Sequence, residues 1–178
     1  MLKIRLANNS STEKATEDLL RKMLEQYDLE PLVFTYDILI KDDAIPHSHP
    51  VLTLNGSMPG DYSSLLASFI HEQMHWYMSS RRGAMFAAIE ELQREYPCLP
   101  NEKNKIARSE FSTYLHLIIN MLEFQGIERF FGLEQAKMII SQKSYYTWIY
   151  KQVLERADCI VAIMSKHDLT LPAANIDM

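Results

Sequence analysis

The order of apolar and polar residues divides the chain into a strand-rich first third and a helical remainder. Three short runs near the N-terminus alternate in polarity or are rich in β-branched and aromatic residues, which favours strands. These runs lie at 2–7, 31–40 and 51–54. Between the first two, Ser11 or Thr12 can cap a helix that continues to about Gln26 on an apolar side formed by residues 19–24.

From Asp61 or Ser63 onward the apolar residues recur with helical spacing. One helix begins there, and further helices are expected at 84–95, 107–125, 133–143 and 145–166. Prolines break the chain after the first of these, and Gly126 and Gly132 bracket the turn after 107–125. This order predicts an α+β domain: a short mixed sheet, with residues 51–54 at its edge, packed on the helix that begins near residue 61, followed by an all-helical part.

Composition adds few constraints. A hydrophobic content of 47% and a charged content of 23% are ordinary for a globular protein, and 178 residues suit one domain spanning 1–178. The net charge of −5 gives no reason to expect nucleic acid or an anionic membrane as partner. The N-terminus lacks an apolar signal region, and no run is apolar for long enough to span a membrane. Cys98 and Cys159 have no C-x-x-C spacing, so we expect free thiols and a cytoplasmic protein.

Residues 71–75 read His-Glu-Gln-Met-His, an H-E-x-x-H motif inside the helix that begins near residue 61. Positions i and i+4 of a helix share a face, so His71 and His75 can bind the same ion. Glu72 lies beside them, where its carboxylate can take a proton from a water molecule. Two histidines, an open coordination position and a carboxylate base are the core of a zinc hydrolase, so Zn²⁺ is the expected cofactor.

A catalytic zinc site usually has a third protein ligand. The expected helix at 107–125 carries a polar stripe on an otherwise apolar surface. Its members are Ser109, Ser112, Thr113, His116, Asn120 and Glu123. His116 and Glu123 lie roughly 10 Å apart along the helix axis, so they cannot both bind one ion directly. We prefer His116, because Asn120 one turn later can orient a motif histidine. Glu123 is the second candidate and Glu110 the third, and a core histidine satisfied by hydrogen bonds is the alternative interpretation of His116.

The segments SHPVLTLN, FIHEQMHW, STYLHLIINMLE and YTWIY together resemble a little-characterised bacterial group of zincin-like metallopeptidases, over about residues 47–167. The resemblance implies a zincin-like fold in which an edge strand, here residues 50–55, pairs with an extended peptide substrate. It also implies a tyrosine or histidine that stabilises the oxyanion formed in the reaction, for which Tyr146 and His167 are the candidates. Tyr146 is alternatively part of a buried aromatic helix start, and His167 is alternatively a helix C-cap.

The leading hypothesis is a zinc-dependent peptidase or amidohydrolase that acts on a peptide or protein substrate, with Glu72 as general base. The first alternative is a non-catalytic zinc module, in which the metal only ties helices together. Glu72 speaks against that alternative, because a structural site needs no base. A metal-free helical interaction domain is the third hypothesis. The sequence identifies neither the substrate nor the oligomeric state.

Overall fold

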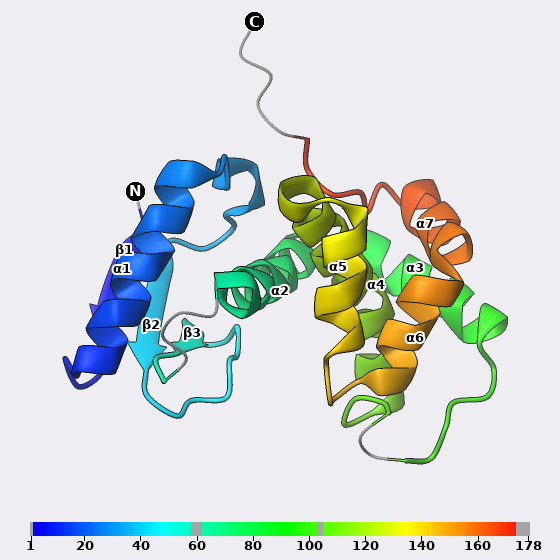
Figure 1. The fold of residues 1–178 in the computed structure, drawn as a ribbon. Helices are drawn as coiled ribbons and strands as arrows, with labels where there is room; N and C mark the ends of the chain where they lie inside the picture. Colours follow the sequence, from blue (N-terminus) through cyan, green and yellow to red (C-terminus); the bar gives the residue numbers. More distant parts are fainter. Residues whose placement is uncertain (1, 58–61, 103–104, 174–178) are drawn as a thin grey trace, which may run out of the picture. The chain divides into compact units, whose positions relative to one another are not determined.

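A computed structural model describes residues 2–57, 62–102 and 105–173 (Figure 1). The Asp61 helix start expected from the sequence lies outside these residues. The described part of the chain is α+β, with a small parallel sheet and seven α-helices. It forms two compact units: unit 1 runs from Met1 to Tyr77 and includes the last residues from Pro172, and unit 2 comprises Met78–Leu171. The expectation of a single domain stays a prediction. No helix of the described residues is long and apolar enough to cross a membrane.

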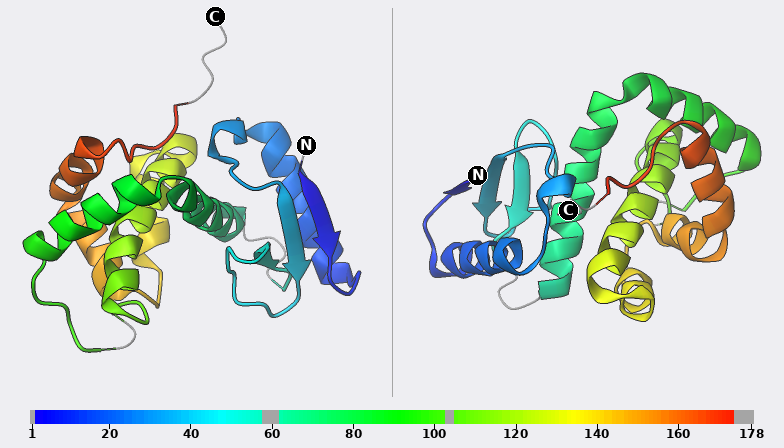
Figure 2. Two further views of the ribbon diagram at one scale, coloured as in Figure 1. Left: turned by 180° about the vertical axis from the view of Figure 1, so that it is seen from behind. Right: turned by 90° about the horizontal axis from the view of Figure 1, so that it is seen from above.

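Unit 1 is built on a three-stranded sheet in the order β1-β2-β3. The strands are β1 (Lys3–Leu6), β2 (Asp37–Lys41) and β3 (Leu52–Asn55). The helix α1 (Ser11–Gln26) connects β1 to β2 and lies along one face of the sheet (Figures 1 and 2). Alternate residues of the strands and one side of α1 are completely buried and form the core of this unit. They are Leu20, Met23, Ile38, Ile40, Leu52 and Leu54.

The positions of these elements confirm part of the sequence prediction and correct the rest. β3 is an edge strand as expected, and α1 has the expected length, although its N-cap is Ser10. A mixed sheet is wrong for the named strands, because both pairings are parallel. A parallel pair needs a crossover, and α1 provides it between β1 and β2. The strand expected at 31–40 begins only at Asp37, because Pro31 lies in a 3-10 helix, η1 (Glu30–Leu32).

The helix α2 (Tyr62–Ser80) carries the H-E-x-x-H motif. Most of its surface is apolar, and Leu66, Phe69, Ile70 and Met74 are completely buried. Burial of these side chains stabilises the helix more than intrinsic propensity does. The boundary between the two units falls within α2, after Tyr77.

Unit 2 contains five helices in its described residues. They are α3 (Arg82–Glu95), α4 (Glu110–Phe131), α5 (Leu133–Ser141), α6 (Thr147–Glu155) and α7 (Ala157–Lys166). The central helix is α4, which packs against each of the other four (Figure 2). Ser109 caps its N-terminus by accepting a hydrogen bond from the amide of Ser112 at 3.1 Å. Gly132 ends it with a φ of 80°, a conformation that glycine adopts without steric cost.

Several helix boundaries in unit 2 differ from the expectation, and two of the differences are large. α4 continues through Gly126, which is buried, because one glycine costs a helix only about 1 kcal/mol and the packing of α4 outweighs it. The helix expected at 145–166 is two helices, α6 and α7, separated at Arg156, where φ is −127°. No glycine or proline marks this break in the sequence. The Arg156 guanidinium instead pairs with Glu95 of α3 at 2.6 Å.

Candidate metal centre

The motif helix is anchored in unit 1 through Gln73, the residue after Glu72. The Gln73 side chain is completely buried. Its amide oxygen accepts hydrogen bonds from the backbone N–H groups of Phe34 (2.8 Å) and Thr35 (2.9 Å). Its amide nitrogen donates to the Thr35 carbonyl at 3.0 Å. These bonds set the rotation of α2 about its own axis. The sequence analysis missed Gln73, although a glutamine on an apolar helix surface was an available signal.

One turn further on, Trp76 makes a second anchor. Its indole N–H donates to the carbonyl of Ser48 at 2.9 Å, and the His49 ring stacks on the indole with ring centroids 4.3 Å apart. The Nδ1 atom of His47 lies 2.9 Å from the carbonyl oxygen of Ile45. His47 and His49 therefore organise the loop that precedes β3.

The outer edge of β3 is covered at its middle. His47 and Thr53 form an antiparallel bridge, in which the His47 amide donates to Thr53 at 3.1 Å and the Thr53 amide donates to His47 at 2.8 Å. The outward-facing backbone groups of Thr53 are therefore used within the chain. A substrate peptide cannot pair with Thr53 while this bridge is formed, so the expectation of an extended peptide along residues 50–55 is wrong at this position.

His71 and His75 lie one turn apart on α2, with ring centroids separated by 5.1 Å in an edge-to-face arrangement. This is the arrangement that the motif predicts, since both rings lie on one face of the helix. Glu72 is buried next to them, with 5% of its surface exposed. Little of Glu72 is therefore in contact with bulk water.

His116 lies on α4 and is also buried. Its Nδ1 atom is 2.6 Å from the carbonyl oxygen of Ser112, one turn earlier, and 3.3 Å from the Ser112 hydroxyl. A carbonyl oxygen can only accept a hydrogen bond, so Nδ1 carries a proton, and in the neutral ring Nε2 then carries the lone pair. Metal-binding histidines are commonly held in this way, with one ring nitrogen donating to a backbone carbonyl and the other bound to the ion.

The metal-ligand candidates are divided between the two units. His71 and His75 lie on α2 in unit 1, and His116 lies on α4 in unit 2. Three histidines are a known ligand set of catalytic zinc.

The other third-ligand candidates, Glu123 and Glu110, both lie on α4 in unit 2. Glu123 is buried and accepts a hydrogen bond from the Tyr150 hydroxyl at 2.9 Å. Its second oxygen lies 3.6 Å from the Lys143 ammonium. Burial alone lowers the pKa of Lys143, but the charges of Glu123 and then Tyr145 outweigh it and raise the pKa above its ordinary value. Lys143 is therefore a cation that balances Glu123. Glu110 is exposed in the first turn of α4.

Tyr146 and His167 have different surroundings. The Tyr146 ring lies against the His116 ring, with centroids 4.6 Å apart. The Tyr146 backbone is left-handed (φ 55°, ψ 32°) at the N-cap of α6, which costs of order 1 kcal/mol for a residue with a side chain. His167 caps the C-terminus of α7, and its Nε2 atom lies 2.9 Å from a carboxylate oxygen of Glu91, which also binds Lys166. Of the two candidates, the structure brings Tyr146 to His116 and pairs His167 with Glu91.

Asn120 lies one turn after His116 and is completely buried. Neither its amide nitrogen nor its amide oxygen has a hydrogen-bond partner among the described residues. Leaving such a group unsatisfied costs about 1–3 kcal/mol. A buried amide one turn from a candidate metal ligand is compatible with a metal centre, where a ligand or a water molecule can become its partner.

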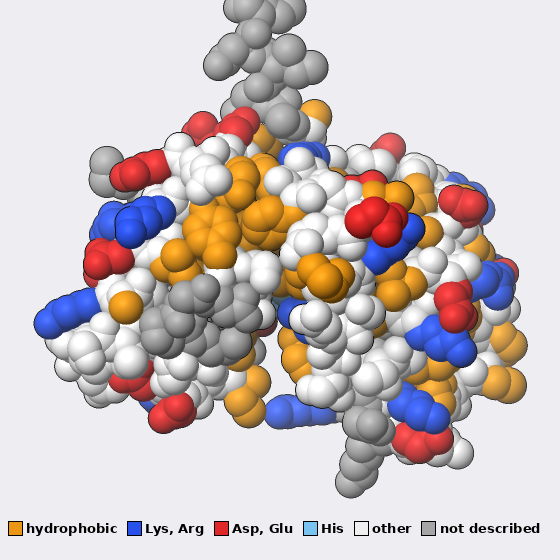
Figure 3. Space-filling model, viewed as in Figure 1, with side chains coloured by type: hydrophobic (Ala, Val, Ile, Leu, Met, Phe, Trp, Pro, Cys, Tyr) orange, Lys and Arg blue, Asp and Glu red, His pale blue; other side chains and the backbone are white. Residues whose placement is uncertain are grey.

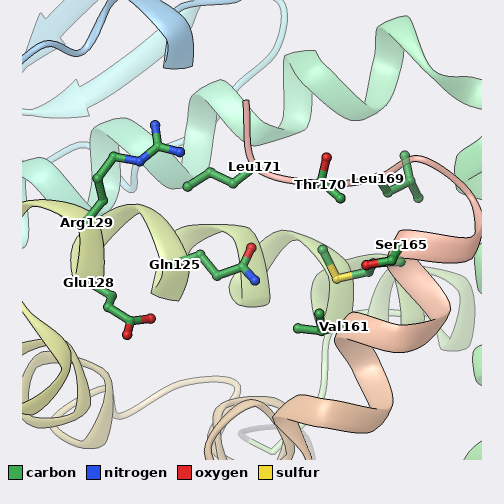
Figure 4. Close-up of a pocket in the computed structure, with 9 residues that line it drawn as sticks. Gln125, Glu128, Arg129, Val161, Ser165, Leu169, Thr170 and Leu171 are labelled. Carbon is green, nitrogen blue, oxygen red and sulfur yellow. The ribbon is translucent and has the colours of Figure 1, made fainter. Parts of the chain in front are cut away.

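A separate pocket of about 350 Å³ lies in unit 2 between α4, α7 and the segment after α7 (Figure 4). Gln125 and Glu128 of α4 and Val161 and Ser165 of α7 contribute to its wall. None of the histidines of the candidate metal centre lines it.

On the face seen in Figure 3, acidic and basic side chains are interspersed.

Comparisons with protein-family models, with characterised proteins and with solved structures find no match for this chain. Function therefore has to be argued from the site itself.

Proposed function

We propose that this protein is a zinc-dependent hydrolase that cleaves peptide or related amide bonds, with His71, His75 and His116 as metal ligands. The observation that carries the proposal is the pair of histidine rings on one face of α2, with the buried Glu72 between them in the sequence. The Nδ1–H of His116 donates to Ser112, which supports Nε2 as the ligand atom. His167 is left out of the proposed reaction, because its ring pairs with Glu91.

Zinc held by these histidines would supply a Lewis acid that polarises the substrate carbonyl and lowers the pKa of a bound water molecule. Glu72 takes a proton from the attacking water and later passes it to the leaving nitrogen. The water oxygen thereby becomes bonded to the carbonyl carbon and the C–N bond breaks. The products are an amine that carries the transferred proton and a carboxylic acid that carries the other proton of the water. Tyr146, in contact with His116, is the proposed donor to the oxygen that becomes negatively charged.

We also propose a cytoplasmic location. Cys98 and Cys159 are both free thiols in the structure. Free thiols persist in a reducing compartment.

One observation favours the alternative of a non-catalytic zinc module. The bridge between His47 and Thr53 covers the edge along which the resemblance places a peptide. In that alternative the metal ties helices together, and Glu72 has no chemical role. Both hypotheses predict bound zinc, and only the hydrolase predicts that Glu72 controls a reaction.

The test compares zinc-loaded wild-type protein with Glu72→Gln, which keeps the size of the side chain and removes the proton acceptor. Both are incubated with a peptide mixture, and new termini are followed by mass spectrometry. We expect Glu72→Gln to keep its zinc and to slow cleavage by about 10²–10⁴-fold. Glu90→Gln on the exposed side of α3 is the matched control and should cleave at the wild-type rate. Unchanged cleavage by Glu72→Gln, or no cleavage by fully zinc-loaded wild type, would contradict the proposed reaction.

A further inference from the structure

A pocket of about 480 Å³ in unit 2 is formed mainly by the segment that precedes α4 in the sequence. It is lined by Asn101, Ile106, Ala107, Arg108 and Tyr146. Tyr146 is shared between this pocket and the contact with His116, where the two ring centroids are 4.6 Å apart. Tyr146 therefore contributes to this pocket and also contacts a proposed metal ligand. Its volume suits one or two amino-acid residues of a substrate.

The backbone on both sides of Arg108 is held in place by hydrogen bonds. The carbonyl of Lys105 accepts from the Trp148 amide of α6 at 3.1 Å. The amide of Ala107 donates to the Thr113 hydroxyl at 3.2 Å, and that hydroxyl donates to the Ser109 carbonyl at 2.9 Å. The segment that carries Arg108 is thus tied to both α4 and α6, and the pocket is formed before a ligand arrives.

Among the described residues that line this pocket, Arg108 is the only charged side chain. Arg108 is exposed, and within the described residues it forms no ion pair with a carboxylate. The closest acidic neighbour before it in the sequence, Glu102, is paired with Lys105 at 2.7 Å. None of the described lining residues is acidic, and Asn101 adds a polar side chain. An exposed, planar guanidinium that forms no ion pair can bind a carboxylate through two parallel hydrogen bonds.

We propose that this pocket binds a carboxylate of the substrate, with Arg108 as the residue that recognises it. The carboxylate is either the C-terminus of a peptide or an acidic side chain, since both present the same two oxygens. Calling the ligand a substrate rests on the proposed hydrolase function, whereas the preference for a carboxylate rests on the pocket alone.

The test measures binding, so that it does not depend on catalysis. Zinc-loaded protein is titrated by fluorine NMR with N-trifluoroacetyl-phenylalanine and with its C-terminal amide. A second pair, the α-amides of N-trifluoroacetyl-glutamate and N-trifluoroacetyl-glutamine, separates side-chain from C-terminal recognition. For one of these pairs we expect the acid to bind at least about tenfold more tightly than the neutral partner, as for a hydrogen bond to a charged group. Arg108→Ala should abolish the preference, and Arg108→Lys should keep part of it.

Arg94→Ala is the matched control, because Arg94 is an exposed arginine of the same unit, on α3, and its loss should leave the preference unchanged. Circular dichroism spectra identical to wild type establish that each variant is folded.

The preference should also persist in the His71→Ala, His75→Ala double variant, whose metal content is expected to be low. Loss of the preference there would mean that the carboxylate binds the metal, and would overturn the proposal. Equal binding of acid and neutral probe by wild type in both pairs, or an unchanged preference in Arg108→Ala, would overturn it as well. Failure of the hydrolase proposal is recognised separately, by cleavage that does not depend on Glu72.

Discussion

Replacing Gln73 by leucine should destabilise the fold without removing a metal ligand. Leucine is similar in volume and in helix propensity, so the substitution leaves no large cavity and keeps α2 helical. It does remove all three hydrogen bonds to Phe34 and Thr35, with lengths of 2.8, 2.9 and 3.0 Å.

The magnitude follows from these bonds. A neutral hydrogen bond contributes about 1 kcal/mol net, so the loss of three predicts a decrease of about 3 kcal/mol in the free energy of unfolding. Phe34 and Thr35 are half-buried, and water can reach part of the backbone that is freed. The full desolvation penalty for three unsatisfied backbone groups is therefore not expected. The expected decrease in the free energy of unfolding is about 2–4 kcal/mol. For a typical domain stability of about 5–15 kcal/mol, this is a large effect.

Urea unfolding followed by far-UV circular dichroism measures the change. The midpoint should fall, while the slope with urea should stay the same. Gln93→Leu, on the exposed side of α3, is the same substitution without these contacts and should change stability by less than about 0.5 kcal/mol. A Gln73→Leu effect as small as that of the control would refute the assignment of Gln73 as the anchor of the motif helix.

His116→Ala should weaken zinc binding far more than Glu123→Gln in competition with a chromophoric chelator, and the reverse order would assign the third ligand to Glu123. A strong chelator should lower the melting temperature, because an ion that binds only the folded state stabilises it, and an unchanged value would contradict a metal shared between helices. Lys143→Met should cost about 2–3 kcal/mol in urea unfolding, because it removes the ammonium that lies 3.6 Å from the buried Glu123 carboxylate; an unchanged free energy of unfolding would refute this. Hydrogen bonds from Lys166 lower the pKa of Glu91 below 4.5, so its contribution to stability is present above that pH and is lost as the pH falls through the lower, folded-state pKa. The stability difference between wild type and Glu91→Gln should therefore shrink on acidification, and a constant difference would contradict the ion pair.

Elements with a local signal could be predicted from the sequence. α1 begins at a serine cap and ends where its apolar side ends, and β3 coincides with a short β-branched run. The direction of strand pairing has no such signal, which is why a mixed sheet was expected in place of a parallel one. The break at Arg156 was missed for a similar reason. The break is accompanied by a contact between Arg156 and Glu95, which is far away in the sequence, and no glycine or proline marks it.

The same distinction applies to the candidate site. The pairing of His71 and His75 is a property of any helix, so the motif alone predicts it. The partners of Gln73 lie 39 and 38 residues away in the sequence, and no periodicity identifies them. The bridge that covers Thr53 is made by a loop residue, His47, whose course the sequence pattern does not determine.

A crystal structure of the zinc-loaded protein, with anomalous scattering measured at the zinc edge, tests the central claim most directly. The account predicts one zinc ion bound to nitrogens of His71, His75 and His116 at about 2.0–2.1 Å, with a fourth coordination position that a substrate or water can occupy. Zinc bound to Glu123 or Glu110 in place of His116, or the absence of zinc from the histidines, would contradict it.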